Sequence, residues 1–536
     1  MNSAMPQWPR TIDWSAHCRA MAARFKERIA VRDAQDQTLS YGQLVNHALK
    51  LADALKARGA RFGTPVASLL PNSLDAVWVS LGLKIGGFAE VALGWGTTAD
   101  EIAWSTHVSG ATWLLTVDRG FERAAHAGLQ AIDIHSLQAA WNREPVDLHW
   151  SPADSVTSVP AETTGRIQFT SGTTGRPKGV LTTHARRWLG EQMQKACLPF
   201  APQPGERILL MTPFVHGAGL LSAAWLDCGG EIILHDGVDP SRVHPLLDKG
   251  ELAAMFAPPT VLAKLVAAFT DQELPGLRCI FTGTQPLAEG LYKRARKMFG
   301  PVVRITYGKT ECINPITTLV FDEIDAAFAE TPLSGASCTG WPAPGVELSI
   351  GQPGIPSTLP AGEDEVWCRA PQQSDGMLTL DGFQPHQPDG WHATGDLGFI
   401  DHRGRLWLTG RVADVIKTGG YRVNPDEIEA ALAGMRCCLA VCVTAIPSDY
   451  WGDIIVAAIE GAQSGWQEEM STRLQTLSRH KHPRLTVEWS DLPRNPQGKV
   501  SRRKLRELIL ERYTLRDGAY PALSPVDSNS SALGAS

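Results

Sequence analysis

Short apolar runs alternate with segments of helical periodicity over much of the chain from Arg166 onward. The runs "RIQF", "RILLM", "EIILH", "AAMFA", "RCIF" and "VVRITY" are separated by amphipathic stretches such as "PTVLAKLVAAF" and "LAEGLYKRARKMF". Strand, helix and strand at this spacing predict parallel βαβ units in a twisted sheet. The N-terminal part, with "LVNHALKLADALKARG", is expected to continue the pattern. The predicted fold class is therefore α/β, with a large N-terminal domain of doubly wound sheets.

The pattern changes after about Gly340, where proline and glycine become frequent and strands joined by turns are expected. We predict a small β-rich subdomain at about 335–410 within an N-terminal domain of residues 1–410. "GFIDHRGRLWLTGR" predicts a hairpin that turns at His402–Gly404. A domain boundary is placed near Arg411, and a small, mobile α+β domain is expected over 411–520. The small, polar residues of 521–536 are expected to be a disordered tail.

A helix start is marked by "VNPDEIEAAL" in the C-terminal region. Asn424 is the expected N-cap and Pro425 the first helical residue, with acids in the first turn.

Three polar segments that contain glycine follow predicted strands: "TSGTTG", "TGTQP" and "YGKTE". In open α/β sheets, ligands bind outside the carboxyl ends of the strands. The sequence thus predicts one shared ligand site built from these segments.

The segment "FTSGTTGRPKGV", residues 169–180, has a composition that suits a polyphosphate. It offers hydroxyls, backbone N–H groups that glycine leaves accessible, and a lysine. It is not a Walker A loop, because the lysine lacks the preceding glycine and the following Ser or Thr. From composition alone, a solvated surface loop stays open as the alternative.

The overall composition is that of a globular protein, with 43% hydrophobic and 20% charged residues. A net charge of −6 gives no electrostatic footprint for nucleic acid. We find no apolar run long enough to span a bilayer and no apolar core of a signal peptide. The ten cysteines include no CxxC pair, which argues against a zinc site or a redox motif. Since no export signal is evident, reduced cysteines in a cytoplasm are expected. A homodimer stays open.

Five motifs together resemble the adenylate-forming superfamily, which includes acyl- and aryl-CoA synthetases. They are "FTSGTTGRPKGV", "YGKTE", "TGDLGFIDHRGRLWLTGR", "VIKTGGYRVNPDEIE" and "LPRNPQGKVSRRKLR", in the family's order. The resemblance covers most of residues 30 to 515. It implies that ATP, Mg²⁺ and coenzyme A take part, and that a carboxylic acid is converted to an acyl-adenylate and then to a thioester.

The resemblance also implies roles for single residues. The β- and γ-phosphates would be held by Thr170, Ser171, Gly172, Thr173, Thr174, Gly175 and Lys178. Glu311 would associate with magnesium and Thr310 would contact the α-phosphate. Tyr307 and the backbone of Gly283, Thr284 and Gln285 would pack around adenine. Asp396 would bind the ribose hydroxyls, with Arg411 nearby.

Two segments of the C-terminal domain are expected to serve successive steps. Lys499 would bridge the attacking carboxylate and the α-phosphate. Lys417, Gly419 and Gly420 would be presented for the thioester step after the domain rotates. Arg502, Arg503 and Lys504 are expected to form only a basic surface helix. Ala413 and Lys309 depart from the family pattern.

The acyl pocket is expected around His216, a gate residue that we also count among the catalytic candidates. The other expected lining residues are Gly217, Ala257, Pro258, Thr282, Gly283, Cys312 and Ile313. Gly217 stands where amino-acid-activating relatives carry an aspartate, which argues against an amino-acid substrate. "TECIN" is similar to the benzoate-type ligases, chlorobenzoate–CoA ligases among them, so an aromatic or compact apolar acid is predicted.

Two other functions stay open. One is a stand-alone adenylation enzyme that loads a separate carrier protein. The other is a non-catalytic nucleotide-binding protein on the same fold.

Overall fold

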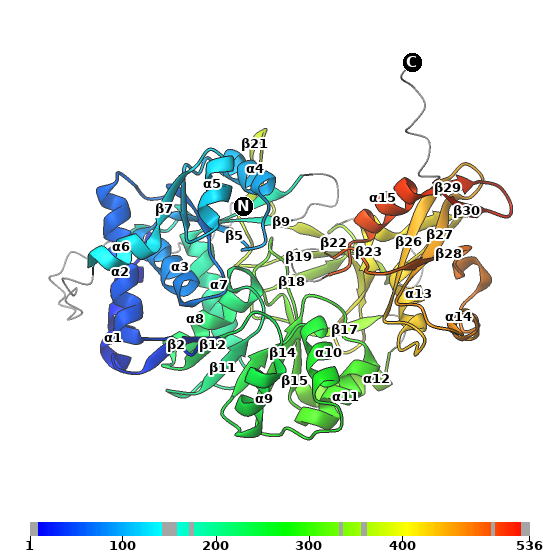
Figure 1. Cartoon of the computed structure of the whole chain (residues 1–536), viewed down its shortest axis with the longest axis horizontal. Helices are drawn as coiled ribbons and strands as arrows, with labels where there is room; N and C mark the ends of the chain where they lie inside the picture. The colour runs from blue at the N-terminus through cyan, green and yellow to red at the C-terminus, as the bar shows by residue number, and fades with distance from the viewer. Residues whose placement is uncertain are drawn as a thin grey trace, which may run out of the picture.

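The computed structural model describes residues 9–141, 158–170, 176–331, 336–354, 362–494 and 499–526. Within them lie two large sheets and one small five-stranded sheet, together with two two-stranded sheets (Figure 1). The small sheet and helices α13–α15 lie together at one end of the molecule, and α1, α2 and α6 lie at the opposite end. The predicted α/β class, with a large N-terminal and a smaller C-terminal domain, is confirmed.

The first sheet has eight described strands. Their order is β21 (Gly382–Pro385), β20 (Gly376–Thr379), β10 (Lys178–Thr183), β9 (Thr164–Thr170), β5 (Ala89–Leu93), β4 (Pro65–Leu69), β6 (Trp113–Thr116) and β7 (Gln130–Asp133). Strands β9, β5, β4, β6 and β7 run parallel to one another, whereas β10 is antiparallel to β9.

The second sheet has thirteen described strands. Their order is β18 (Glu347–Ile350), β19 (Asp364–Arg369), β22 (His392–Ile400), β23 (Leu406–Arg411), β17 (Ser337–Pro342), β16 (Thr317–Leu319), β15 (Val303–Tyr307), β14 (Cys279–Gly283), β13 (Ala254–Phe256), β11 (Arg207–Leu210), β12 (Glu231–Leu234), β2 (Ile29–Asp33) and β3 (Thr38–Ser40). From β15 to β2 every pair is parallel. This is the predicted βαβ arrangement.

The β-rich region does not form a sheet of its own. Strand β17 pairs with β16 and so extends the second sheet, whereas β20 pairs with β10 of the first sheet. The region expected at about 335–410 therefore ties the two large sheets together.

The helices of the N-terminal part lie between and outside these sheets. They are α1 (Trp14–Phe25), α2 (Tyr41–Ala57), α3 (Leu74–Gly86), α4 (Ala99–Ser109), α5 (Gly120–His126), α6 (Ile134–Trp141), α7 (His184–Ala196), α8 (Gly219–Asp227), α9 (Pro240–Asp248), α10 (Pro259–Ala268), α11 (Glu289–Phe299) and α12 (Phe321–Ala329). Helices α8 to α11 each connect two consecutive strands of the parallel region. No helix among the described residues is long and apolar enough to cross a membrane.

The C-terminal part has its own hydrophobic cores. Its sheet contains β25 (Tyr421–Val423), β24 (Ile416–Thr418), β27 (Gly452–Glu460), β26 (Ala440–Ser448) and β28 (Leu485–Trp489), and its helices are α13 (Pro425–Leu432), α14 (Trp466–Leu474) and α15 (Arg502–Arg512). Two clusters of buried side chains draw only on residues from Ile416 onward.

The ordered chain extends further than the sequence indicated. Strand β29 (Tyr513–Arg516) pairs with β30 (Ala522–Pro525), where a disordered tail from 521 was predicted. That start of the tail is wrong, because "ALSP" supplies backbone partners for β29. Residues 527–536 lie outside the described residues.

Two local predictions are confirmed. Strands β22 and β23 form a hairpin, and the amide of Gly404 donates to the carbonyl of Asp401 at 2.9 Å. The side chain of Asn424 caps α13 by accepting from the amide of Asp426, with Pro425 as the first helical residue.

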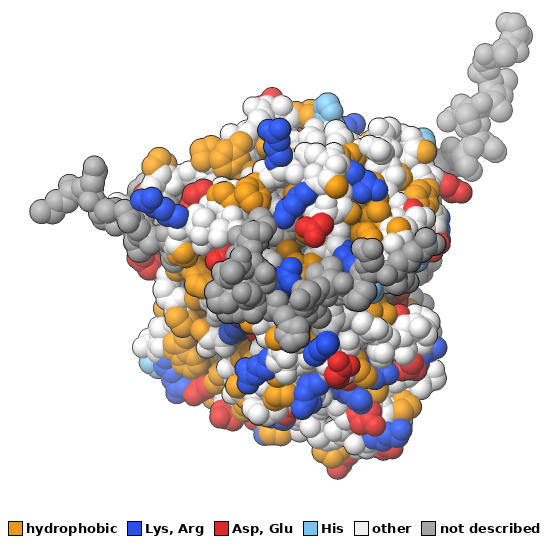
Figure 2. All heavy atoms as spheres, turned by 90° about the vertical axis from the view of Figure 1, so that its left-hand side faces the viewer, with side chains coloured by type: hydrophobic (Ala, Val, Ile, Leu, Met, Phe, Trp, Pro, Cys, Tyr) orange, Lys and Arg blue, Asp and Glu red, His pale blue; other side chains and the backbone are white. Residues whose placement is uncertain are grey.

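Basic and acidic side chains are interspersed over the face of the molecule shown in Figure 2. That face therefore carries no extended surface of a single charge, in line with the net charge of −6.

Candidate active site

The loop that resembles a phosphate cradle connects two antiparallel strands. Thr170 ends β9, Lys178 begins β10, and the two are direct register partners. A strand thus intervenes before the expected helix, α7. Ser171–Gly175, which include most of the predicted phosphate-binding residues, lie outside the described residues.

Trp104 on α4 holds the C-terminal arm of this loop. Its indole Nε1 donates to the carbonyl of Pro177 at 2.8 Å, and the guanidinium of Arg176 lies 4.5 Å from the ring centroid. The sequence reasoning missed Trp104, since it lies 73 residues before Pro177 and belongs to no motif.

We expect Trp104→Leu to raise the KM for ATP by about 5–50-fold, because it removes a hydrogen bond and a cation–π contact that position the loop. Initial rates with ATP varied would measure this. Trp113→Leu is the matched control, since its indole donates to Gln130 away from the loop. An unchanged KM in Trp104→Leu would contradict a positioning role.

Tyr307, the last residue of β15, and Arg411, the last residue of β23, both contact Asp396 on β22. The Tyr307 hydroxyl donates to Asp396 Oδ2 at 2.6 Å, and Arg411 Nε lies 3.2 Å from Asp396 Oδ1. Asp396 and Arg411 are also register partners. Burial and the neighbouring Asp396 raise the pKa of Tyr307 well above its usual value, so the phenol stays protonated. The contacts with Tyr307 and Arg411 therefore fix the orientation of the Asp396 carboxylate.

Lys499 reaches this group from the C-terminal part of the chain. Its Nζ donates to the carbonyl of Thr284, which follows β14 in a left-handed conformation at φ 68°. Burial lowers the pKa of Lys499 to about 8; nearby Arg411 acts in the same direction and Asp396 opposes it. The structure therefore brings the lysine to the residues predicted to bind the nucleotide.

Thr310 and Glu311 lie between β15 and β16. The Glu311 carbonyl accepts from the amide of Ser374 at 2.8 Å, and within the described residues its carboxylate makes no hydrogen bond or ion pair. No cluster of three or more metal-ligating side chains occurs in the described chain. One carboxylate suits Mg²⁺, which is commonly held by one or two carboxylates plus substrate phosphates. The unusual Lys309 donates to the carbonyl of Thr394 and so fixes the strand that carries Asp396.

His216 lies in a π-helical turn, Phe214–Ala218, before α8. Its backbone departs from helical geometry at φ −107° and ψ −147°. Burial, with nearby Arg166, lowers the pKa of His216 to about 4, so the imidazole is neutral at pH 7. It can act as a wall or hydrogen-bonding group but carries no charge.

The remaining pocket residues divide into two sets. A Cβ on Gly217 would lie 3.5 Å from the Phe256 ring, and one on Gly190 of α7 would meet Ile313. Gly217 thus lies at van der Waals distance from Phe256, and Ile313 packs closely against Gly190; sequence reasoning missed Phe256 and Gly190. Gly283 is buried at the end of β14. Pro258 precedes α10 as its N-cap.

Ala257, Thr282 and Cys312 are fully buried in packing. Ala257 and Phe256 belong to two different hydrophobic cores, on opposite faces of the sheet. Thr282 and Gly283 are successive residues of one strand, so they too face opposite sides of the sheet. The pattern of motifs could not show this, because it does not indicate which face of a strand end is lined by a neighbouring element.

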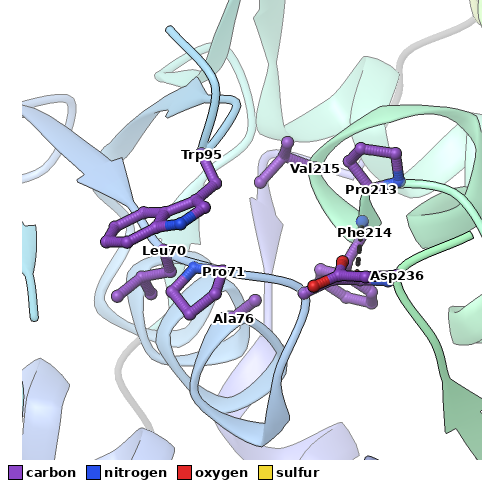
Figure 3. A pocket seen from close by; sticks show the side chains of 9 residues that line it. Leu70, Pro71, Ala76, Trp95, Pro213, Phe214, Val215 and Asp236 are labelled. Carbon is purple, nitrogen blue, oxygen red and sulfur yellow. Dashed lines mark hydrogen bonds between the residues drawn. The ribbon is translucent and has the colours of Figure 1, made fainter. Parts of the chain in front are cut away.

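A small pocket beside this turn is bounded by Trp95, Leu70 and Pro71 on one side and by Phe214 and Asp236 on the other (Figure 3). Asn72, which also lines the pocket, joins its two sides: its Oδ1 accepts from the Phe214 amide at 2.9 Å, and its Nδ2 donates to the carbonyl of His235 at 2.9 Å. These bonds fix the turn that carries His216.

The segment predicted for the thioester step packs within the C-terminal part. Lys417, Gly419 and Gly420 belong to the β24–β25 hairpin, whose glycines adopt φ 55° and φ 83°. The Gly419 amide donates to the carbonyl of Trp451 within the C-terminal part. The described structure thus presents Lys499, and not this hairpin, to the nucleotide residues.

Arg502 contradicts the expectation of a basic surface helix. Its side chain is 18% exposed, and it pairs with Asp414 at 2.8 Å, Glu429 at 2.7 Å and Asp426. Arg503 and Lys504 are 55% and 52% exposed, as expected of surface residues. The prediction for Arg502 was wrong because its partners lie far from it in sequence.

The sequence is similar to those of known enzymes. A model of the AMP-binding enzyme family matches residues 18–378. A 2-succinylbenzoate–CoA ligase of Geobacillus sp. (strain WCH70) is 27% identical over 496 residues, covering 90% of this chain and 95% of that protein. The long-chain-fatty-acid–CoA ligase FadD13 of Mycobacterium tuberculosis is 27% identical over 530 residues, covering 93% and 98%.

Among solved structures, the chain is similar to o-succinylbenzoate CoA synthetase of Bacillus subtilis in complex with its acyl-adenylate intermediate. The TM-score is 0.78 at 26% identity, and the match covers 92% of this chain and 98% of that one.

Proposed function

The chain belongs to the AMP-binding enzyme family, and on this basis we propose that it is an ATP-dependent carboxylate–CoA ligase. The family resemblance drawn from the five motifs is thus confirmed. In the proposed reaction, a carboxylate oxygen attacks the α-phosphorus of ATP and pyrophosphate leaves. The thiol of CoA then attacks the acyl carbon, a C–S bond forms, and AMP leaves.

The observation that carries the proposal is the contact between Lys499 and the Thr284 carbonyl, beside the Tyr307–Asp396–Arg411 group. Asp396 can accept hydrogen bonds from ribose hydroxyls while Arg411 and Tyr307 hold it in place. Lys499 would then lie where negative charge accumulates between the carboxylate and the α-phosphate. A preorganised cation at such a point stabilises the transition state.

Glu311 is the proposed magnesium-associated residue. Its carboxylate is free of hydrogen bonds and ion pairs within the described residues, and an oxygen ligand suits this cation. When bound, magnesium would neutralise charge on the phosphates. Thr310 would contact the α-phosphate from the same connection.

The test is a screen for pyrophosphate release over a panel of carboxylic acids, with and without CoA. We expect acid-dependent pyrophosphate release, and AMP with a CoA thioester when CoA is present. The panel should include benzoate-like, short and long-chain acids, because we propose an aromatic or compact apolar acid. Equal or faster turnover of long fatty acids would overturn that choice of substrate, and absence of acid-dependent pyrophosphate release would overturn the ligase itself.

The adenylation rate is expected to fall as the pH rises through about 8. Burial lowers the pKa of Lys499 to about 8, and the cationic form is the one that stabilises the transition state. Above that pH the amine is neutral and the stabilisation is lost. A pH profile of pyrophosphate release at saturating ATP would measure the alkaline limb.

Lys499→Arg provides the control for this assignment, since a guanidinium stays charged across the range. Its residual activity should lack the limb near pH 8. A limb that persists unchanged would assign it to another group.

We propose that the C-terminal part from residue 411 acts as a lid. Its separate hydrophobic cores and the distance in sequence between Lys499 and the Lys417–Gly420 hairpin support a rotation that exchanges the two segments. The turn Val412–Asp414, which contains Ala413, follows β23 and is the proposed hinge.

The cytoplasm is the proposed location. All ten cysteines are free thiols, which fits a reducing compartment.

A further inference from the structure

Arg304, in the middle of β15, carries a buried charge that no described residue compensates. The residue is 3% exposed, its Nε has no hydrogen-bond partner, and no ion pair or hydrogen bond to its guanidinium occurs within the described residues. Its recorded neighbours are the Phe281 ring, 5.9 Å away, and the thiols of Cys279 and Cys197. Burial raises the pKa of both thiols, so neither supplies an anion.

The other arginine buried to this degree shows what a structural role requires. Arg405 is 1% exposed and pairs with Asp401 and with Glu330, each at 2.7 Å. An unpaired buried charge costs several kcal/mol, and arginine cannot escape that cost by losing its proton. A methionine or leucine would fill the place of Arg304 without this cost. Packing alone therefore does not account for Arg304.

The position of Arg304 connects it with the proposed acyl site. Thr306 lies two residues further along β15 on the same face, roughly 7 Å nearer the carboxyl end of the strand. Thr306 pairs with Gly283, where an added Cβ would collide with the Thr306 carbonyl. Arg304 itself pairs with Phe281, which belongs to the same core as Phe256, the residue facing Gly217.

The contacts of helix α7 agree with this position of Arg304. Gly190 meets Ile313 near the strand ends, and Cys197, two turns later on the same face of the helix, lies beside Arg304. Arg304 therefore lies on the face of β15 that packs toward α7, below the strand ends where the acid is expected.

We propose that Arg304 recognises a second carboxylate on the substrate, so that the enzyme activates a dicarboxylic aromatic acid whose distal carboxylate points toward the floor of the site. This rests on the proposed ligase function and narrows its substrate class. A guanidinium matches a carboxylate with two parallel hydrogen bonds, and such charged bonds are stronger than neutral ones. The apolar walls around Arg304 would hold the connecting ring or chain.

The test compares matched pairs of benzoic acids that carry either a second carboxyl group or its primary amide at the 2-, 3- or 4-position, directly or on a two-carbon arm. We expect kcat/KM for pyrophosphate release to favour the best dicarboxylate over its amide by at least about tenfold. In Arg304→Met this preference should disappear, through a loss of about 10–100-fold for the dicarboxylate and little change for the amide. Arg278→Met, at an exposed arginine paired with Glu206, is the control and should keep the preference.

Thermal unfolding separates recognition from a structural role. Because Arg304→Met removes an uncompensated charge, its Tm should equal or exceed that of the parent protein. A marked fall in Tm with an unchanged acid-to-amide ratio would overturn the proposal, and so would equal turnover of the acids and amides by the parent enzyme. If no acid of any kind gives pyrophosphate release, the ligase function has failed; if only neutral acids react, the recognition by Arg304 has failed alone.

Discussion

Lys499→Ala is expected to slow acid-dependent pyrophosphate release by about 10²–10³-fold, the usual cost of removing one preorganised group that stabilises developing charge. The Thr284 carbonyl fixes the ammonium beside Asp396 and Arg411, so its position is set before the reaction begins. Single-turnover measurement of acyl-adenylate formation would give the rate. Binding of ATP, followed by titration calorimetry, should change little.

Two comparisons make this result specific to the first half of the reaction. The variant should still form the thioester when supplied with CoA and a synthetic acyl-adenylate, because the adenylate bond already exists. Lys504→Ala, at a lysine that is 52% exposed on α15, should retain full activity. Adenylation by Lys499→Ala at the parent rate would remove this lysine from the mechanism.

Arg502→Met is expected to destabilise the C-terminal part by roughly 3–5 kcal/mol, because it leaves Asp414, Asp426 and Glu429 close together without their cation. Glu429 depends on this pairing most, since burial raises its pKa and Arg502 opposes the shift. Urea unfolding followed by tryptophan fluorescence would measure the loss without screening the charges. Arg503→Met, at an exposed neighbour, should change stability by less than about 0.5 kcal/mol.

The pH dependence of this loss has a definite sign. Without Arg502, burial and the neighbouring Asp426 hold the pKa of the Glu429 carboxyl in the folded state above its value in the unfolded chain. The folded variant then binds protons more tightly, so its deficit is largest at neutral pH and shrinks below about pH 5. A deficit that stays constant from pH 7 to pH 4 would argue that packing, and not charge, explains the effect.

The fold could be predicted largely from the periodicity of hydrophobic residues. Each parallel strand from β11 to β15 is a short apolar run, and a helix separates it from the next strand. The pairing of β10 with β9 could not, because "KGVLTT" follows the glycine-rich loop directly and resembles its continuation. The strand β30 was missed because its four residues, Ala522–Pro525, are too few to show a periodicity; it is their pairing with β29 that makes them a strand.

The sequence by itself determined the family, the reaction class and the order of the motifs. Each of these depends on short contiguous segments, which can be recognised without knowing how the chain folds. Tertiary structure alone decided which charges are paired. Arg502 and Arg503 are adjacent and chemically identical, yet one holds three acids up to 88 residues away and the other is exposed. Arg304 lies in an apolar strand in which nothing in the sequence marks it as unpaired. The physical reason is that the energy of a charge depends on burial and on partners brought from distant segments, and these are set only when the sheets and the C-terminal part assemble.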